Sequence, residues 1–106
     1  MTYTFIPAVG DQLEIPDEGT LSRVLYRDDR LRVVGFAFDQ DQELTEHTAA
    51  VPALIQVMSG RLRVGLGDDT IEMDPGAWLH MEAHLAHSLQ ALEPSVVLLT
   101  MLSNPS

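Results

Sequence analysis

The sequence predicts an all-β domain, either a sandwich or a small barrel. Short runs rich in Val, Ile, Leu, Tyr and Phe recur about every ten residues, as they do in such folds. Turn-forming Gly, Pro and Asp residues separate these runs. The 106 residues fit one domain, and a hydrophobic fraction of 45% is typical of a globular protein. We therefore expect a single β domain over residues 21–103.

The first 20 residues are predicted to form an extended arm ahead of this domain. Two prolines and two glycines interrupt the segment, which leaves only short extended pieces at residues 3–6 and 12–15. At the other end, residues 104–106 (Asn-Pro-Ser) are expected to fray.

Two hairpins are predicted within the domain. In residues 21–38, two β-favouring runs flank the Asp-Asp pair at 28–29, a turn-forming sequence. In residues 61–73, alternating polar and apolar side chains surround a Gly-Asp-Asp turn at 67–69. Both patterns are typical of antiparallel strands joined by tight turns.

The rest of the domain is predicted from the same turn-forming residues and apolar runs. Polar residues 39–48 are expected to form a loop, and apolar residues 51–59, which end at Gly60, a strand. Asp-Pro-Gly at 74–76 predicts another turn, and the Val- and Leu-rich residues 96–102 predict a final buried strand.

Residues 77–93 fit two different predictions. They contain no Gly or Pro and favour a helix, on which His80, His84 and His87 would share one face and could hold zinc. Alternatively, residues 77–81 and 87–92 form two strands joined by a tight connection, and the three rings separate. We favour the strands because a lone helix would interrupt an otherwise continuous series of antiparallel strands.

Composition excludes several classes of function. The net charge is −10, and the six cations are all arginines, so binding to nucleic acid or to an anionic membrane is not expected. The absence of cysteine and lysine excludes disulfides, thiol chemistry and Schiff bases. No apolar run approaches the length of a membrane span, and the N-terminus lacks the features of a signal peptide. We expect a cytoplasmic protein.

Two stretches resemble the motifs of the cupins, a family of small jelly-roll barrels. The first cupin motif, His-x-His followed by Glu and Gly, aligns with EHTAAVPALIQVMSG at residues 46–60. His47 and Gly60 match the first His and the Gly, whereas Ala49 and Ala53 replace the second His and the Glu.

The second cupin motif, Gly followed by Pro-x-Gly and His, aligns with residues 76–87. Gly76 and His87 match its first Gly and its His, and Glu82 and His84 replace the Pro and the second Gly. The resemblance covers roughly residues 20–102, and the segment LTML near the end is similar to the closing strand of small bacterial cupins. It implies a cupin-type jelly-roll β-barrel with an extended N-terminal arm and degenerate metal-binding motifs.

Cupins commonly hold a divalent metal inside the barrel with three histidines and one carboxylate. The resemblance implies His47 and His87 as metal ligands, with Fe, Mn, Zn or Ni as the candidate ion. His80 and Gln56 are candidates for further pocket side chains. Two functions remain open. One is a metal-dependent activity on a small molecule, of the oxygenase or isomerase kind, and the other is a non-catalytic small-molecule-binding barrel that has lost its metal ligands.

Two further expectations concern association between chains and the composition of the core. The extended arm and the long apolar last strand offer area to bury, so we expect a homodimer. Trp78, Met58 and Met81 are expected to belong to the hydrophobic core.

Overall fold

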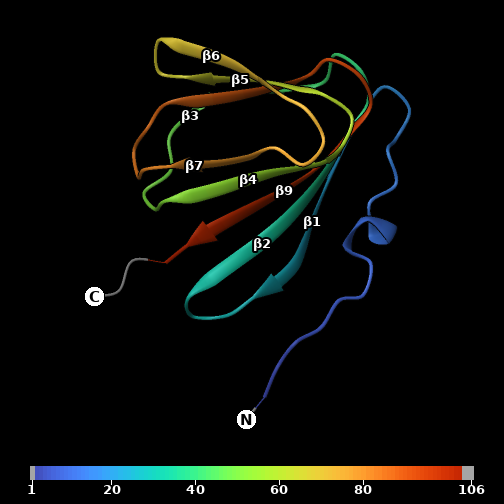
Figure 1. The fold of residues 1–106 in the computed structure, drawn as a ribbon, viewed down its shortest axis with the longest axis vertical. Helices are drawn as coiled ribbons and strands as arrows, with labels where there is room; N and C mark the ends of the chain where they lie inside the picture. The colour runs from blue at the N-terminus through green and yellow to red at the C-terminus, as the bar shows by residue number, and fades with distance from the viewer. Residues whose placement is uncertain (1, 104–106) are drawn as a thin grey trace.

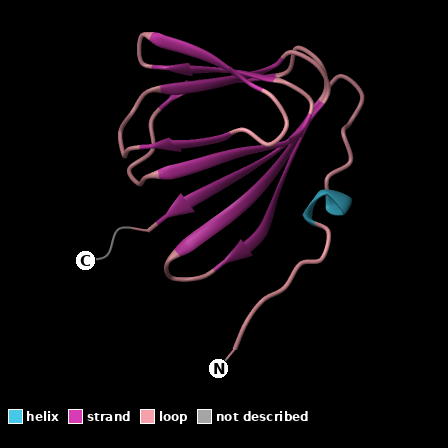
Figure 2. Ribbon diagram, in the orientation of Figure 1, coloured by secondary structure: helices cyan, strands magenta, loops and turns pink. Residues whose placement is uncertain are grey.

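The computed structural model describes residues 2–103, which form an almost entirely β structure (Figure 2). A four-residue 3-10 turn, η1 (Val9–Gln12), lies in the N-terminal arm. The strands that follow are β1 (Thr20–Arg27), β2 (Leu31–Phe38), β3 (Glu43–His47), β4 (Ala53–Ser59), β5 (Leu62–Leu66), β6 (Asp69–Met73), β7 (Trp78–Met81), β8 (His87–Ala91) and β9 (Ser95–Leu102).

The strands form two antiparallel sheets that face each other as a jelly-roll barrel (Figure 1). One sheet has five strands in the order β1-β2-β9-β4-β7, and the other has four in the order β3-β8-β5-β6. Several neighbours in these sheets are distant in the sequence, since β9 pairs with both β2 and β4. The predicted all-β barrel is confirmed.

The core lies between the two sheets and follows the two-residue alternation of each strand. In β4, Ala53, Ile55 and Val57 are buried, whereas the intervening side chains face outward. The same alternation in β5 and β8 directs Leu62, Val64, Leu89 and Ala91 inward. Phe38, Met73, Met81 and Val97 complete the buried cluster. Met81 is therefore a core residue, as predicted.

Residues 77–93, for which the sequence allowed either a helix or two strands, form strands in the structure. Residues 78–81 form β7, residues 87–91 form β8, and the five residues between them form a tight connection. His84 lies in this connection with φ at +70°. The helical alternative, with its stripe of three histidines, is wrong. Pairing of β7 with β4 and of β8 with β3 and β5 outweighs the helix propensity of the segment.

Two other expectations need correction. Residues 39–48 are not entirely a loop, because Glu43–His47 form β3 and pair with β8. Trp78 and Met58 are not core residues, since 59% and 45% of their surfaces are exposed on the outer face of the five-stranded sheet. Both hairpins, at Asp28-Asp29 and at Gly67-Asp68, are present as predicted.

The N-terminal arm runs along the outside of the barrel (Figure 1). Leu13 packs on the outer face of the five-stranded sheet against Ala37 and Val96, and together they form a second, smaller apolar cluster. Gly35 makes this contact possible, because a Cβ at that position would lie 2.5 Å from Leu13 Cδ1. No helix within residues 2–103 is long and apolar enough to cross a membrane. The predicted fraying of residues 104–106 falls outside the described residues.

Candidate functional site

The two histidines that match the cupin motifs lie side by side in the four-stranded sheet. His47 ends β3 and His87 begins β8, and the two residues are direct partners across the antiparallel pair. A register shift between Leu44 and His47 precedes this pairing. Because directly opposed residues present their side chains on the same face, the shift allows both rings to meet.

The two imidazole rings are in contact. Their centroids are 4.2 Å apart and their planes are inclined by 60°, which is an edge-to-face arrangement. His87 continues the inward alternation of Leu89 and Ala91 and is only 6% exposed, whereas His47 is exposed. The pair therefore connects the barrel interior to solvent at one end of the sheet.

Each ring is held by a backbone carbonyl two residues earlier in the chain. His47 Nδ1 lies 2.9 Å from the Thr45 carbonyl oxygen, and His87 Nδ1 lies 2.8 Å from that of Leu85. A carbonyl oxygen only accepts hydrogen bonds, so Nδ1 must be the protonated nitrogen of both rings. In the neutral form each Nε2 then carries a lone pair.

No protein group described in residues 2–103 bonds to either Nε2 atom. No fully buried side-chain nitrogen or oxygen in the same range lacks a partner. The Nε2 of His87 therefore reaches solvent even though most of its ring is buried. Two lone pairs on adjacent rings are thus available to a ligand.

Loops of unusual backbone geometry surround the pair. His84 adopts a left-handed conformation, and its N–H donates to the Ala49 carbonyl at 2.7 Å. This bond ties the loop after β3 to the connection before β8. The Gly67 N–H donates to the Ala86 carbonyl at 2.8 Å and ties the β5–β6 turn to the same connection. These links fix the loops on both sides of His87.

The other two candidate side chains lie elsewhere. His80 on β7 pairs with Leu54, and Gln56 on β4 pairs with Trp78. Both side chains are exposed and alternate with the buried residues of their strands, so they face outward from the five-stranded sheet. The structure does not bring either of them to the His47–His87 pair.

The donor set is short of a complete metal site. Over residues 2–103, no three His, Cys, Asp or Glu side chains come together in a way that could hold a metal ion. The positions of the missing cupin ligands carry the methyl groups of Ala49 and of the buried Ala53. The residues present therefore fit an ion that takes two protein nitrogens and completes its coordination with water or an exogenous ligand. They do not fit a four-ligand protein site.

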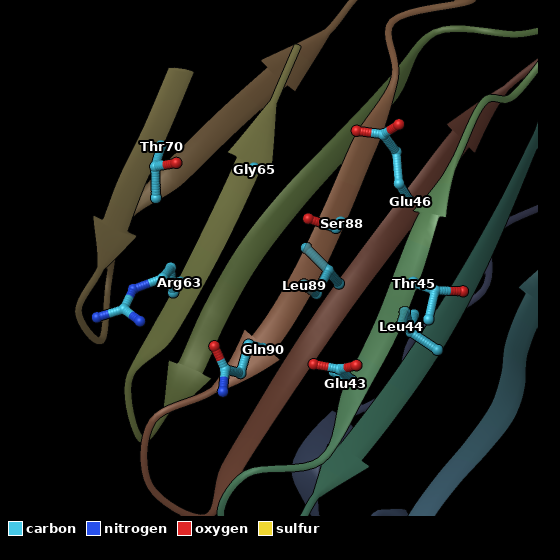
Figure 3. Close-up of a pocket in the computed structure, with 10 residues that line it drawn as sticks. All are labelled: Glu43, Leu44, Thr45, Glu46, Arg63, Gly65, Thr70, Ser88, Leu89 and Gln90. Carbon is cyan, nitrogen blue, oxygen red and sulfur yellow. The ribbon is translucent and has the colours of Figure 1, made fainter. Parts of the chain in front are cut away.

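A separate hollow of about 310 Å³ lies on the outer side of the four-stranded sheet (Figure 3). It is lined by both polar and apolar residues of β3, β5, β6 and β8, and the polar ones include Glu43, Arg63 and Gln90. Gly65 lies in its floor, where a Cβ would approach Ser88 Oγ to 2.6 Å. Neither histidine of the pair lines this hollow.

Sequence reasoning located both rings but missed the groups that orient them. The carbonyl oxygens of Thr45 and Leu85 have no side-chain signature, so the orientation of the two rings could be found only from the structure. The left-handed backbone of His84 had one indirect signal, since this residue occupies a glycine position of the second cupin motif.

Comparison with solved structures identifies the architecture. A conserved protein of unknown function from Streptococcus pyogenes superposes with a TM-score of 0.88 at 23% identity, covering 100% of this chain and 93% of that one. A cupin superfamily protein from Desulfitobacterium hafniense gives 0.87 at 20% identity and covers 98% and 94%. The chain has a cupin fold. An RmlC-like cupin from Shewanella frigidimarina is also similar, with a TM-score of 0.79 at 19% identity and coverage of 100% and 94%.

These likenesses show the cupin fold alone, because all three identities are low. No protein-family model matches the sequence. No curated protein matches it at a significant level either. Within the cupin barrel, Gly60 and Gly76 have φ values of +83° and +90°, and His84 has +70°. The three positions that the motifs assign to glycine therefore all have left-handed backbones, which agrees with the alignment of the two motifs.

Proposed function

We propose that this cupin barrel binds a divalent transition metal through Nε2 of His47 and of His87 and, through the metal, a small molecule. The observation that carries the proposal is the contact between two imidazole rings whose Nδ1 atoms are both committed to carbonyl oxygens. Metal-binding histidines commonly donate their other ring N–H to such an acceptor, which fixes the tautomer and the ring orientation.

The chemistry of the donor set narrows the candidate ions. Imidazole nitrogens suit Zn, Ni, Cu and Fe better than Mg or Ca, and affinity for a given site rises from Mn through Fe to Ni. Among the four ions considered, Ni and Zn are therefore expected to bind more tightly than Fe, and Fe more tightly than Mn. A net charge of −10 also raises the local concentration of cations around the chain.

Two protein ligands leave most of the coordination sphere open. A bound ion there would supply Lewis-acid polarisation to a carboxylate, carbonyl or enolate oxygen of the small molecule. The chain itself holds the two nitrogens at fixed positions on paired strands. It also shields one side of the site with the buried core that begins at Leu89. An oxygenase-like or isomerase-like activity is compatible with this arrangement, and a cytoplasmic location stays a prediction.

A second candidate function follows from a different observation. Ala49 and Ala53 replace two ligands by methyl groups, which removes one carboxylate charge and one imidazole from the site. A barrel with that change would bind a small molecule without metal. In that case the two Nε2 lone pairs accept hydrogen bonds from hydroxyl or N–H groups of the ligand.

Metal titration of tag-free protein tests the proposal. Calorimetry with Zn²⁺ and Ni²⁺, with bound metal counted after dialysis, is expected to give one ion per His47–His87 pair. His87→Ala is expected to weaken binding at least about tenfold, because one of two nitrogen donors is lost. Binding should also weaken as the pH is lowered, because metal binding requires deprotonated ring nitrogens.

Matched controls come from the other two histidines. His80→Gln removes an exposed imidazole from the outer face, and His84→Gly removes one from a position whose backbone favours glycine. Both variants should bind metal as the parent chain does. Less than about a tenth of an equivalent of every metal, or equal losses in His80→Gln and His87→Ala, would overturn the metal proposal. Stabilisation by organic ligands alone would then support the metal-free alternative.

A further inference from the structure

We propose that Arg27 and Arg32 form a binding site for an oxyanion, the carboxylate or phosphate group of a small molecule. The two side chains line a hollow of about 240 Å³ where β1 ends, β2 begins and β9 ends. These strand ends lie together at one edge of the five-stranded sheet (Figure 1). The site uses neither His47 nor His87, and it takes its ligand without metal.

Arg27 and Arg32 are unpaired cations in a strongly acidic chain. The net charge is −10, from 16 acidic residues against six arginines. Arg61 and Arg63 both form ion pairs with Glu72. Within the part of the chain that the structure describes, no carboxylate lies within ion-pair distance of Arg27 or Arg32. Both side chains are exposed, so their charges are accessible to a ligand.

The two arginines lie directly opposite each other. They are partners across the antiparallel pair of β1 and β2. Opposed side chains share one face, with Cβ atoms about 4.5–5.5 Å apart, and like charges in this arrangement destabilise a sheet. The repulsion between Arg27 and Arg32 therefore costs stability in the free protein. An oxyanion bound between the two guanidinium groups replaces this repulsion by two charge-assisted contacts.

The guanidinium group of Arg32 lies on the inner side of the five-stranded sheet. Its Nη2 donates to Met101 Sδ at 3.6 Å, across the pair of β2 and β9. Met101 packs against the barrel core and pairs in turn with the buried Ala53 on β4. Because opposed residues share a face, this row of side chains continues on the inner side to Arg27. A thioether sulfur is a weak acceptor, so most of the five N–H donors of Arg32 remain available.

The one carboxylate among the described residues that line the hollow is already engaged. The Tyr26 hydroxyl donates to Asp28 Oδ2 at 2.6 Å. The N–H groups of Arg30 and Leu31 donate to Asp28 Oδ1 at 2.7 and 3.0 Å. These bonds, that from Tyr26 above all, hold the pKa of Asp28 below its usual value. Its charge is thus bound within the β1–β2 hairpin, and the hollow has two positive charges against one negative charge.

The other walls and the size of the hollow favour a small organic anion. Val51, Met101 and Leu102 contribute apolar surface beside the two cations. A guanidinium group binds a carboxylate or phosphate through two parallel hydrogen bonds, which are stronger where water is partly excluded. The hollow is smaller than the roughly 300–1,000 Å³ typical of sites for larger ligands, which suits a molecule of a few carbon atoms. The charge of −10 also repels a polyanion such as nucleic acid.

NMR titration of the metal-free, ¹⁵N-labelled full chain tests the site. Butyrate, inorganic phosphate and the uncharged analogue butyramide are added at constant ionic strength, and the side-chain Nε–Hε signals of the six arginines are followed. At least one of the two anions is expected to shift the signals of Arg27 and Arg32 along a common saturating curve. The signals of Arg61 and Arg63 should stay in place, and butyramide should shift none of them. The anion that saturates at the lower concentration identifies the charged group that the site prefers.

Matched variants separate the site from a general effect of charge. Arg27→Gln and Arg32→Gln are each expected to weaken anion binding at least about tenfold, because charge-assisted hydrogen bonds are lost. Arg23→Gln is the control, since Arg23 is exposed on the same strand, pairs with Gly35 and carries the same charge. It should bind anions as the parent chain does. In the absence of anion, Arg27→Gln should also leave Tm unchanged or raise it, because a like-charge repulsion is removed.

Four results would overturn the proposal. The first is that the signals of Arg27 and Arg32 stay in place throughout the titration, or shift linearly and equally with those of all other arginines. The second is that Arg23→Gln weakens binding as much as Arg32→Gln does. The third is that butyramide binds as well as butyrate, which would indicate an apolar hollow without charge recognition. The fourth is a fall in the Tm of anion-free Arg27→Gln, which would show that the arginine pair has a structural role.

Discussion

Replacement of Gly60 by Ala is expected to destabilise the barrel far more than the same change at either of two other glycines. Gly60 follows the last residue of β4 in the turn into β5 and has φ at +83°. A Cβ there would lie 2.2 Å from Ser95 Oγ and 2.3 Å from the Pro94 carbonyl oxygen. Ser95 Oγ also accepts the Arg61 N–H at 3.0 Å. Gly60 is therefore packed where the β4–β5 turn contacts the start of β9.

The size of the expected loss in unfolding free energy follows from comparison with two glycines that have space for a Cβ. Gly67 and Gly76 have φ values of +60° and +90°, and a Cβ at either would meet no atom closer than 3.9 Å. Alanine at these two positions costs about 1 kcal/mol, since left-handed strain is partly offset by the restricted unfolded chain. At Gly60 the obstacle includes backbone atoms, and Ser95 must move from its hydrogen bonds. A total of about 3–5 kcal/mol is therefore expected.

Thermal and urea unfolding of the three variants at one protein concentration provides the assay. For a domain of this size, about 1 kcal/mol shifts Tm by roughly 4–8 °C. Gly67→Ala and Gly76→Ala should thus lose a few degrees, and Gly60→Ala should lose at least about 12 °C with an unchanged m-value. Equal losses in all three variants would show that backbone strain alone acts at Gly60 and that its contact with Pro94 and Ser95 is not tight.

Further predictions concern the loss of stability at acid pH, the core and the arm. Asp39 accepts the Glu18 N–H at 2.7 Å, and this bond holds the pKa of the carboxyl below its usual value. Its stabilisation is present above about pH 4 and is lost as the pH falls through the lowered pKa, so the Tm gap between parent and Asp39→Asn should be full at pH 7 and close towards pH 3. Phe38→Ala empties a fully buried position and should cost about 3–5 kcal/mol by urea unfolding; a loss below about 1 kcal/mol would contradict the core as described. Gly35→Ala should detach Leu13 and speed proteolysis of the arm without comparable loss in Tm, and an arm that stays protected would refute that contact.

Local patterning predicted much of the fold because its signals are short in range. Both hairpins follow from Asp- and Gly-containing turns. The final strand follows from a run of Val and Leu, and this strand, β9, lies between β2 and β4 in the sheet. Around His84, where helix propensity and alternation conflict, the surrounding series of strands predicted the structure correctly, and the resemblance to cupin motifs supported the same prediction. The physical reason is strand pairing on both sides of this point, of β7 with β4 and of β8 with β3 and β5, and His84 turns the chain between them with φ at +70°.

The features that were missed depend on contacts between distant segments. Strand β3 is short and polar, with the sequence ELTEH, and becomes a strand only because β8 pairs with it. Trp78 was expected in the core, but it pairs with the exposed Gln56 and lies on the outer face. For the site, sequence placed His47 and His87 at motif positions but could not show that the rings touch. It also could not show that His80 and Gln56 face away from them.

Nitrogen-detected or long-range proton–nitrogen NMR of the histidine rings tests the central claim most directly. In the metal-free protein, the account predicts that His47 and His87 are both protonated at Nδ1. Addition of one equivalent of Zn²⁺ per chain should then shift their two Nε2 resonances and leave those of His80 and His84 in place. Protonation at Nε2 in either ring of the pair, or spectra that do not change at saturating Zn²⁺, would contradict a metal site at His47 and His87.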